Sequence, residues 1–236
     1  EVLVPTPYWE SYADQIKMNE GVPVFVTATE EHHFKVTVDQ LEAARTDKTK
    51  VLLLNSPSNP TGMIYSREEL EAIGNWAVEH DLLILADDIY GRLVYNGNTF
   101  TPISSISESI RQQTIVINGV AKAYAMTGWR VGYAVGNPEI IAAMGKIIGQ
   151  TTSNLTTVAQ YAAIEAFTGP QDTVETMRQA FEERLNTIYP LLAEVPGFEV
   201  VKPEGAFYLF PNVKKAMEMK GFTDVTEFTT AILEEV

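Results

Sequence analysis

The amino-acid sequence predicts an α/β fold built around a mostly parallel sheet. Two unbroken apolar runs, at residues 51–54 and 82–86, have the length and composition of strands that are buried on both faces. Between them, Ser66 and Glu69 form a capping box that opens a helix pattern reaching about Glu79. Buried strands that alternate with helices are typical of βαβ units, in which the strands run parallel.

Shorter patterns predict the other elements. They are strands at residues 2–4, 22–26, 114–117 and 131–135, and helices at residues 39–44, 140–148 and 174–192. Apolar positions recur at spacings of three and four in the last two helices, so we interpret their stripes as core packing. Strands at 198–201 and 207–210, followed by an amphipathic helix over 225–236, indicate part of a smaller α+β domain.

The ends of the sequence suggest an internal segment of a longer protein. The chain opens directly in a strand pattern, without an initiator methionine, and closes in a helix pattern that no capping or turn residue follows. We therefore expect residues 1–180 to form a large domain that lacks its N-terminal part. Residues 181–236 would then be a truncated part of a small C-terminal domain.

Composition narrows the class of protein and of partner. With 236 residues, 45% of them hydrophobic, the chain can bury a large core. Its net charge of −14 is spread along the sequence, which argues against nucleic acid and anionic membrane surfaces as partners. There is no cysteine, no signal-peptide pattern and no apolar run long enough for a membrane span, so we expect a cytoplasmic protein. The neighbouring His32 and His33 would point to different faces of any regular element, so we expect no metal site there.

Chemistry is expected around Lys122, which follows the strand predicted at residues 114–117 and an Asn-Gly turn. A lysine among small and aromatic residues often lays its stem on apolar surface and keeps its ammonium in water. Alternatively it is desolvated, and its lowered pKa lets it form an imine with a carbonyl compound. Two other polar loops, which contain Asn59 and Asp87, also follow predicted strands. Because ligands gather outside the carboxyl ends of parallel strands, we expect the three loops to face one crevice.

Four motifs, in this order along the chain, resemble those of the pyridoxal-phosphate enzymes of fold type I. More narrowly, they resemble the class I aminotransferases of the aspartate aminotransferase kind. The motifs are the loop at residues 57–62, Asp87-x-x-Tyr90, the segment at residues 122–130, and the Gly-Ala-Phe-Tyr run at residues 205–208. The resemblance extends over essentially the whole chain. It implies the three-layer aspartate aminotransferase fold, in which a mostly parallel sheet forms the large domain.

The resemblance assigns roles to residues at the strand ends. Lys122 would hold pyridoxal 5′-phosphate as an internal aldimine and then act as the general base that moves the α-proton of the substrate. Asp87 would pair with the pyridine nitrogen and favour its protonated form, unless it is only a cap or turn residue. Tyr90 and Asn59 would hydrogen-bond the ring oxygen beside the imine, and Asn59 could also touch the substrate carboxylate. The ordinary alternatives are a half-buried tyrosine and a turn former.

The same resemblance gives roles to three further side chains. Arg130 would bind the cofactor phosphate through two of its N–H groups. The alternative is a surface ion pair, although an arginine in this apolar segment has little surface to occupy. Trp9, or as a second choice Tyr8, would stack on the pyridine ring, with plain core packing as the alternative. We expect Asp88 to face solvent, and Asn59–Pro60 to be a cis peptide bond.

Two features depart from the family pattern. Family members often carry serines just before the lysine, but residues 119–121 are Gly-Val-Ala and offer no hydroxyl to a phosphate. The family also has an upstream glycine-containing phosphate loop and a carboxylate-binding arginine near its C-terminus, and neither has a match here. Part of the cofactor pocket and the main substrate anchor would then lie outside this sequence.

The function implied by the resemblance is transfer of an amino group from an amino acid to a 2-oxo acid, by a ping-pong mechanism through pyridoxamine phosphate. We expect aspartate and 2-oxoglutarate as substrates, with aromatic or broad specificity next, and a homodimer that shares residues across its interface. Two alternatives stay open. One is another pyridoxal-phosphate reaction, such as a carbon–sulfur β-lyase that releases ammonia and pyruvate. The other is a catalytically silent fragment or binding module.

Overall fold

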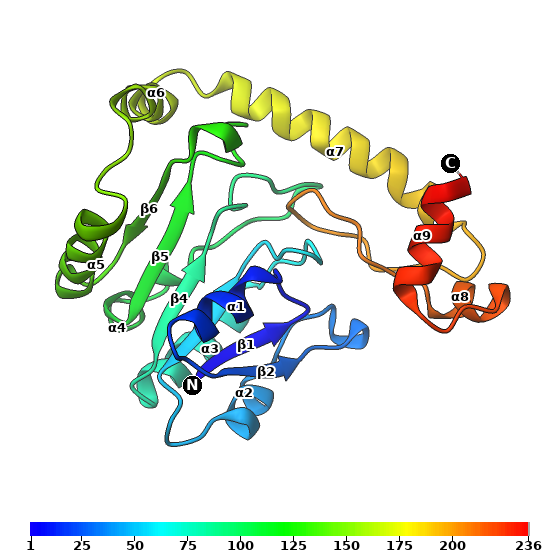
Figure 1. Ribbon diagram of the computed structural model, residues 1–236, viewed down its shortest axis with the longest axis horizontal. Helices are drawn as coiled ribbons and strands as arrows, with labels where there is room; N and C mark the ends of the chain where they lie inside the picture. Colours follow the sequence, from blue (N-terminus) through cyan, green and yellow to red (C-terminus); the bar gives the residue numbers. More distant parts are fainter. Residues whose placement is uncertain (236) are drawn as a thin grey trace.

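The computed structural model describes residues 1–235 and contains a six-stranded sheet flanked by helices (Figure 1). The strands are β1 (Val2–Thr6), β2 (Pro23–Thr27), β3 (Val51–Asn55), β4 (Leu83–Asp87), β5 (Thr114–Gly119) and β6 (Gly132–Val135). Their order is β2-β1-β3-β4-β5-β6, and every neighbouring pair is parallel except β5 and β6. This confirms the mostly parallel α/β sheet. The exception arises because the chain returns from β5 to β6 through a 3₁₀ turn, η3 (Thr127–Trp129), without a crossover helix.

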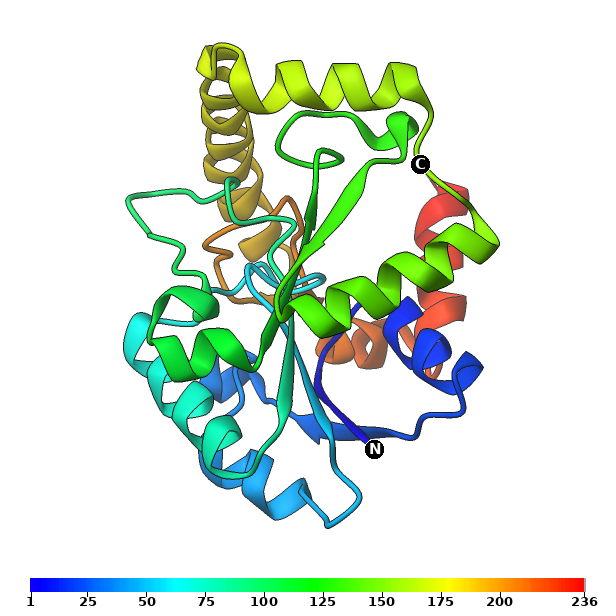
Figure 2. The same ribbon diagram turned by 90° about the vertical axis from the view of Figure 1, so that its left-hand side faces the viewer.

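The helices between the strands lie on two faces of the sheet. They are α1 (Ser11–Met18), α2 (Val38–Ala44), α3 (Arg67–Glu79) and α4 (Glu108–Gln112), with 3₁₀ turns η1 (Glu30–His32) and η2 (Ile103–Ser105). The chain crosses the sheet in one direction from β1 to β2 and in the opposite direction from β3 to β5. Right-handed crossovers therefore place α1 on one face and α3 and α4 on the other, as Figure 2 shows.

The start of α3 and the core beneath it follow from the sequence. Ser66 Oγ accepts a hydrogen bond from the Glu69 N–H at 3.2 Å, and the Glu69 carboxylate accepts one from the Ser66 N–H at 2.7 Å, so the predicted capping box is present. The helix then buries Leu70, Ile73, Trp76 and Ala77. They join the main core, whose fully buried members include Leu3, Leu41, Leu52, Ile84 and Ile110.

The last part of the chain is mainly helical. Its elements are α5 (Pro138–Thr151), α6 (Thr157–Thr168), α7 (Asp172–Ala193), β7 (Glu199–Val200), β8 (Pro211–Asn212), α8 (Lys214–Lys220) and α9 (Val225–Glu235). In Figure 1, α7 runs from the sheet side of the molecule to the small unit formed by α8 and α9. The predicted C-terminal helix is confirmed as α9 as far as Glu235, and Val236 lies outside the described residues. No helix in residues 1–235 is long and apolar enough to cross a membrane.

The two strands predicted near the C-terminus are shortened or absent. The first is reduced to β7, and residues 207–210 form no strand, because the antiparallel partner of β7 is β8 just beyond them. Aromatic packing explains the error. Phe207 meets the ring of Tyr90 edge-on, and Phe210 meets Phe34 in the same way, so this apolar run packs through its side chains without a strand ladder.

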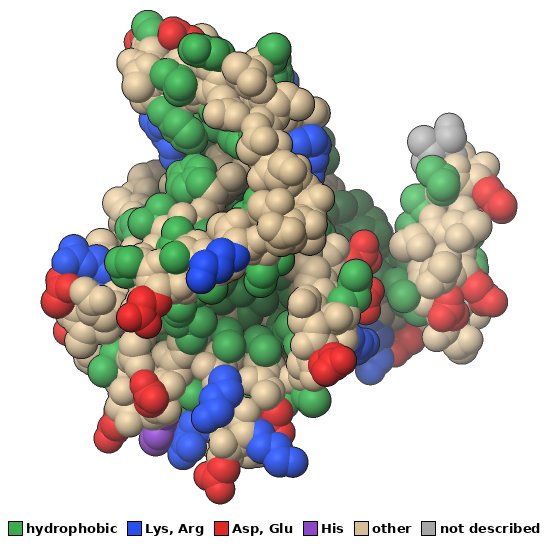
Figure 3. All heavy atoms as spheres, turned by 60° about the vertical axis from the view of Figure 1, so that its left-hand side comes forward, with side chains coloured by type: hydrophobic (Ala, Val, Ile, Leu, Met, Phe, Trp, Pro, Cys, Tyr) green, Lys and Arg blue, Asp and Glu red, His purple; other side chains and the backbone are tan. Residues whose placement is uncertain are grey.

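The interpretation of both long apolar stripes as core packing is wrong for α5 and only partly right for α7. No residue of α5 is buried, and Ile147 and Ile148 are 65% and 46% exposed. Figure 3 shows hydrophobic side chains at the surface on this side of the molecule. On α7, Val174 and Leu185 are buried, whereas Leu191 is exposed. Nothing in residues 1–235 buries the α5 stripe, so spacing alone overestimated the core.

The division predicted between residues 180 and 181 falls inside α7, and it remains a prediction. A second buried cluster draws its members from both sides of that position, and they include Tyr90, Leu93, Leu185 and Ala206. The C-terminal segment is therefore packed directly against residues that follow β4.

Candidate active site

The six site residues proposed from the sequence all line one pocket at the carboxyl ends of the strands. Its volume is about 470 Å³, a size typical of small-molecule sites. The six residues are Trp9, Asn59, Asp87, Tyr90, Lys122 and Arg130. The structure thus brings together side chains that lie at the ends of β1, β3, β4 and β5 or in the loops after them.

The register of the strands explains this convergence. Asn55 at the end of β3 pairs with Asp87 at the end of β4, and Asp87 pairs with Ile117 of β5. After β1 the chain turns to β2 on one side, whereas β3 lies on the other side of β1. A crevice at such a reversal is where open α/β sheets bind ligands.

The carboxylate of Asp87 is held in one orientation. Its Oδ2 accepts a hydrogen bond from the Tyr12 hydroxyl at 2.7 Å, and its Oδ1 accepts one from the Ile89 N–H at 3.1 Å. Burial raises the pKa of Asp87, while these two hydrogen bonds and the charge of Lys122 act in the opposite direction. The site therefore contains a desolvated carboxyl whose ionised form is stabilised by fixed donors.

Tyr12 is a site residue that the sequence analysis missed. It lies on α1, is only 6% exposed, and lines the pocket. Burial, followed by the neighbouring Asp87 carboxylate, raises the pKa of its phenol far above the usual value, so it stays a neutral donor. The one signal available was its position three residues after Trp9, which is about one helical turn.

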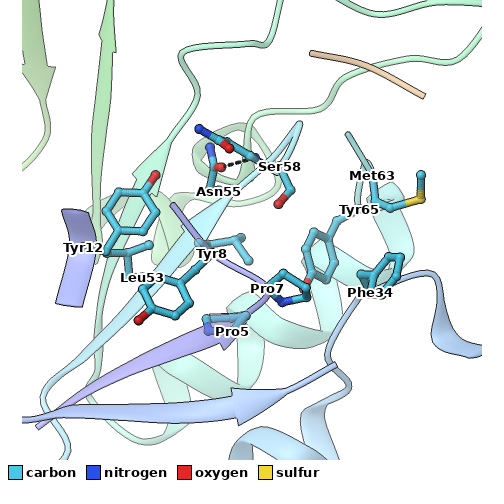
Figure 4. A pocket seen from close by; sticks show the side chains of 12 residues that line it. Pro5, Pro7, Tyr8, Tyr12, Phe34, Leu53, Asn55, Ser58, Met63 and Tyr65 are labelled. Atoms are coloured by element: carbon cyan, nitrogen blue, oxygen red, sulfur yellow. Dashed lines mark hydrogen bonds between the residues drawn. The ribbon is translucent and has the colours of Figure 1, made fainter. Parts of the chain in front are cut away.

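Asn55 ties two of the site loops together. Its Nδ2 donates to the backbone oxygen of Asp87 at 2.9 Å, and its Oδ1 accepts from the Asn59 N–H at 2.7 Å. Figure 4 shows Asn55 and Tyr12 at one side of a small neighbouring pocket. The Asn59–Pro60 peptide is cis, as predicted.

Tyr90 shares a hydrogen bond with a second tyrosine. The hydroxyls of Tyr90 and Tyr208 lie 2.5 Å apart, and either can be the donor. Burial, followed by the neighbouring Tyr208 hydroxyl, raises the pKa of Tyr90, while the nearby Asn59 side chain acts in the opposite direction. Tyr208 also lines the pocket, so the Gly-Ala-Phe-Tyr motif contributes a hydroxyl to which the sequence analysis gave no role.

Lys122 points into the pocket and is half-buried. Its Nζ lies 5.7 Å from the centre of the Tyr90 ring and 5.4 Å from that of Phe207, distances at which a cation interacts with aromatic faces. No carboxylate of residues 1–235 lies within ion-pair distance of it, although its charge lowers the pKa of Asp87. This placement favours the reactive amine over a lysine that only covers outer surface.

Arg130 lines the pocket from a left-handed backbone conformation, with φ at 54°. Its Nη1 donates to the Thr127 backbone oxygen at 2.9 Å, and within the described chain it forms no ion pair. The expectation that this arginine has little surface is wrong, because the side chain is exposed at the turn that precedes β6. The guanidinium is therefore accessible to an anion, and the Thr127 residue beside it also lines the pocket.

The geometry separates Trp9 from Tyr8. Trp9 lines the pocket, is 40% exposed, and packs edge-on against Tyr12 at 5.3 Å. Tyr8 instead stacks on Phe25 at 5.2 Å and lies in the small pocket of Figure 4. Of the two, only Trp9 has a ring available to a ligand in the larger pocket.

The expectation that Asp88 faces solvent is wrong. It is only 6% exposed, because its N–H donates to the Ile117 oxygen at 3.0 Å and so prolongs the pairing of β4 with β5 by one residue. Burial, together with the charge of Asp87, raises the pKa of Asp88 to about 7.

Comparison with known proteins places these residues in a family. The model of the family described as "Aminotransferase class I and II" matches residues 1–236. An asparagine--oxo-acid transaminase of Streptococcus mutans is 81% identical over the whole chain, and an aspartate aminotransferase of Bacillus subtilis is 54% identical. The chain spans about 60% of the length of these curated relatives.

Solved structures agree. The aspartate aminotransferase of Rhizobium meliloti superposes with a TM-score of 0.88 at 39% identity, covering 91% of this chain and 54% of that one. The aspartate aminotransferase of Thermus thermophilus with maleate superposes with a TM-score of 0.84 at 39% identity, covering 89% of this chain and 55% of that one. Both support the aspartate aminotransferase fold expected from the motifs.

Proposed function

We propose transamination on one premise: this chain belongs to the class I and II aminotransferases. Aspartate aminotransferases of this family depend on pyridoxal 5′-phosphate, which supplies an electron sink for the carbon that loses a proton. The proposal is that the full-length protein uses this cofactor to move an amino group from an amino acid to a 2-oxo acid in a ping-pong reaction.

The observation that supports this most is the set of groups in one pocket. A primary amine at Lys122 suits an aldehyde, an oriented carboxylate at Asp87 suits a protonated pyridine nitrogen, and a guanidinium at Arg130 suits a phosphate. The residues present therefore fit the cofactor.

In this proposal each residue has one task. Lys122 Nζ would hold the cofactor covalently, and as a free amine it would move the α-proton of the substrate. Asp87 keeps the pyridine nitrogen protonated, which its fixed donors assist. Tyr90 and Asn59 donate hydrogen bonds to the ring oxygen, Arg130 binds the phosphate, and Trp9 covers the ring face.

The amino donor we propose is aspartate, with 2-oxoglutarate as the acceptor. Asparagine is a second candidate, because the 81% identical relative is named as an asparagine--oxo-acid transaminase. The two donors differ only in a terminal carboxylate or amide, so a side chain that contacts that group would decide between them. We also propose a homodimer, and a cytoplasmic location remains a prediction.

Borohydride reduction tests the central claim. The full-length protein is incubated with pyridoxal phosphate, reduced, digested and mapped, in parallel with Lys122→Ala and with the exposed control Lys146→Ala. We expect one label per chain on residue 122 in the parent and in the Lys146 variant, and none in Lys122→Ala. Label scattered over surface lysines in the parent protein would contradict the assignment.

Product analysis tests the reaction class. With aspartate or asparagine, we expect amino transfer that requires 2-oxoglutarate, and the ratio of kcat/KM values identifies the donor. A cysteine thioether is tested separately: release of its thiol together with ammonia and pyruvate, without an acceptor, would establish the β-lyase alternative. Specific label on Lys122 without either reaction would indicate a catalytically silent protein.

A further inference from the structure

The hydroxyl pair of Tyr90 and Tyr208 poses a question of direction. A tyrosine hydroxyl has one proton and accepts through its lone pairs. If Tyr90 donates to Tyr208 across their 2.5 Å contact, its only proton is engaged and none remains for a ligand. If Tyr208 donates, the proton of Tyr90 is free to point elsewhere.

The proposed function narrows the choice of donor. In it the single proton of Tyr90 goes to the ring oxygen of the cofactor, so that proton cannot also bond Tyr208. The 2.5 Å contact then needs Tyr208 as its donor. Both tyrosines line the pocket in which the cofactor would lie.

We propose that Tyr208 is a positioning residue whose hydroxyl donates to Tyr90 and thereby directs the Tyr90 proton to the ring oxygen of the cofactor. This inference rests on the proposed function and adds a residue to it. Tyr208 acts through Tyr90, and the effect is read at Lys122 Nζ. A hydrogen bond donated to the ring oxygen stabilises the negative charge on that oxygen. The oxygen then depends less on the proton at Lys122 Nζ, so loss of that proton becomes easier.

The backbone around Tyr208 is held firmly enough for such a task. The Gly62 oxygen accepts from the N–H groups of both Glu204 and Gly205, at 3.0 and 2.9 Å. The Ala206 N–H donates to the Leu93 oxygen at 2.9 Å, and the Tyr95 hydroxyl donates to the Ala206 oxygen. Two loops that flank the pocket therefore fix the residues just before Tyr208.

Side-chain contacts complete the support. The Glu204 carboxylate accepts from the Ile64 N–H at 2.9 Å. The Tyr208 ring lies edge-on to that of Tyr90, with centres 5.7 Å apart. Removing only the Tyr208 oxygen leaves these packing contacts in place, so Tyr208→Phe isolates the hydrogen bond.

The test is the pH titration of the bound cofactor's absorbance in the full-length protein, which follows the proton at Lys122 Nζ. We expect Tyr208→Phe to raise the midpoint by about 0.5–1 pH unit, the equivalent of one ordinary hydrogen bond. Tyr90→Phe should raise it further. The double variant should match Tyr90→Phe alone, because Tyr208 has no effect without the Tyr90 hydroxyl. Tyr12, Asp87 and Arg130, which also line the pocket, and Asp88, which follows Asp87, keep their side chains in all variants.

Tyr189→Phe is the matched control, since this tyrosine belongs to the same aromatic cluster but lies outside the pocket. Its midpoint should equal that of the parent. An unchanged midpoint in Tyr208→Phe, or shifts that add in the double variant, would overturn the inference and leave only a packing role. Thermal unfolding of each variant separates loss of fold from loss of the hydrogen bond. If the parent protein carries no cofactor on Lys122, the proposed function itself fails, which is a distinguishable result.

Discussion

The hydroxyl of Tyr12 donates to Asp87 Oδ2 across 2.7 Å, and this contact links α1 to the end of β4 over 75 residues of sequence. It gives the carboxylate a fixed donor from a side chain that is itself buried. A buried carboxyl without such a donor has a raised pKa and tends to become neutral. The tyrosine therefore helps Asp87 to remain an anion in the pocket.

Tyr12→Phe should weaken cofactor binding. Loss of a hydrogen bond to a charged group costs about 1.5–3 kcal/mol, which corresponds to roughly tenfold or more in affinity. The pKa of Asp87 should also rise, since one of the groups that lower it is removed. Because a higher folded-state pKa means earlier protonation on acidification, the loss of affinity should grow as the pH falls. Absorbance titration of the full-length protein with pyridoxal phosphate at several pH values measures both effects.

Tyr8→Phe is the control for that substitution. Tyr8 stacks on Phe25 and does not line the larger pocket. The affinity of the Tyr8→Phe variant for pyridoxal phosphate, and its pH dependence, should therefore equal those of the parent. Equal affinities for the Tyr12 and Tyr8 variants would show that the Tyr12 hydroxyl does not support Asp87.

Asp88→Asn should stabilise the protein at neutral and alkaline pH. The folded-state pKa of Asp88 is about 7, above the ordinary 3.8, so the folded protein holds more protons than the unfolded chain between these values. Its free energy of unfolding therefore decreases as the pH rises through this window, by at most ~1.4 kcal/mol per pH unit from this group. Asparagine does not titrate, so the variant escapes this loss. The excess of its free energy of unfolding over that of the parent should grow from pH 5 to about 7 and then level off.

Urea unfolding at pH 5, 6, 7 and 8 measures this difference. The control is Asp47→Asn, because Asp47 is exposed in a loop and its carboxylate meets water in both states. An advantage of Asp88→Asn that is the same at every pH would contradict the assignment of a raised pKa.

Gly62→Ala should destabilise the protein far more than Gly97→Ala. Both glycines have positive φ, 71° and 77°, which alone costs a non-glycine residue about 1–2 kcal/mol. At Gly97 an added Cβ meets nothing within 4 Å, whereas at Gly62 it would lie 2.6 Å from Pro203 Cβ and 2.7 Å from the Gly205 oxygen. We expect an additional ~1–3 kcal/mol at Gly62 in urea unfolding, together with a raised cofactor midpoint as Tyr208 is displaced. Equal losses of unfolding free energy in the two variants would show that the backbone near residue 62 relaxes enough to admit a Cβ.

Local signals made the central part of the fold predictable. The buried runs of β3 and β4 and the capping box of α3 each lie within a few residues of sequence. The placement of Asn59, Asp87 and Lys122 in one pocket followed from the rule that ligands bind outside the carboxyl ends of parallel strands. α1 was missed because its only buried residues are Tyr12 and Ala13, which make no apolar stripe.

Partners that are distant in sequence could not be predicted. Tyr12 and Asp87, or Tyr90 and Tyr208, meet only after the sheet and the C-terminal segment are assembled. The burial of Asp88 depends on one extra backbone contact with β5, which no local pattern encodes. For α5, the spacing of apolar residues correctly predicted a helix, but such a stripe does not show which part of the protein would bury it.

The contact between Ile64 and Glu204 joins residues 140 positions apart, and this has a consequence for synthesis. A ribosome adds roughly 5–20 residues per second, so β1 to β5 leave the exit tunnel many seconds before the segment that carries Tyr208. Contacts of such high sequence separation also form slowly in folding. The nascent chain can therefore pair β1 to β5 first, and Phe207 and Tyr208 join Lys122 at the pocket only after the much later segment that carries them has been synthesised.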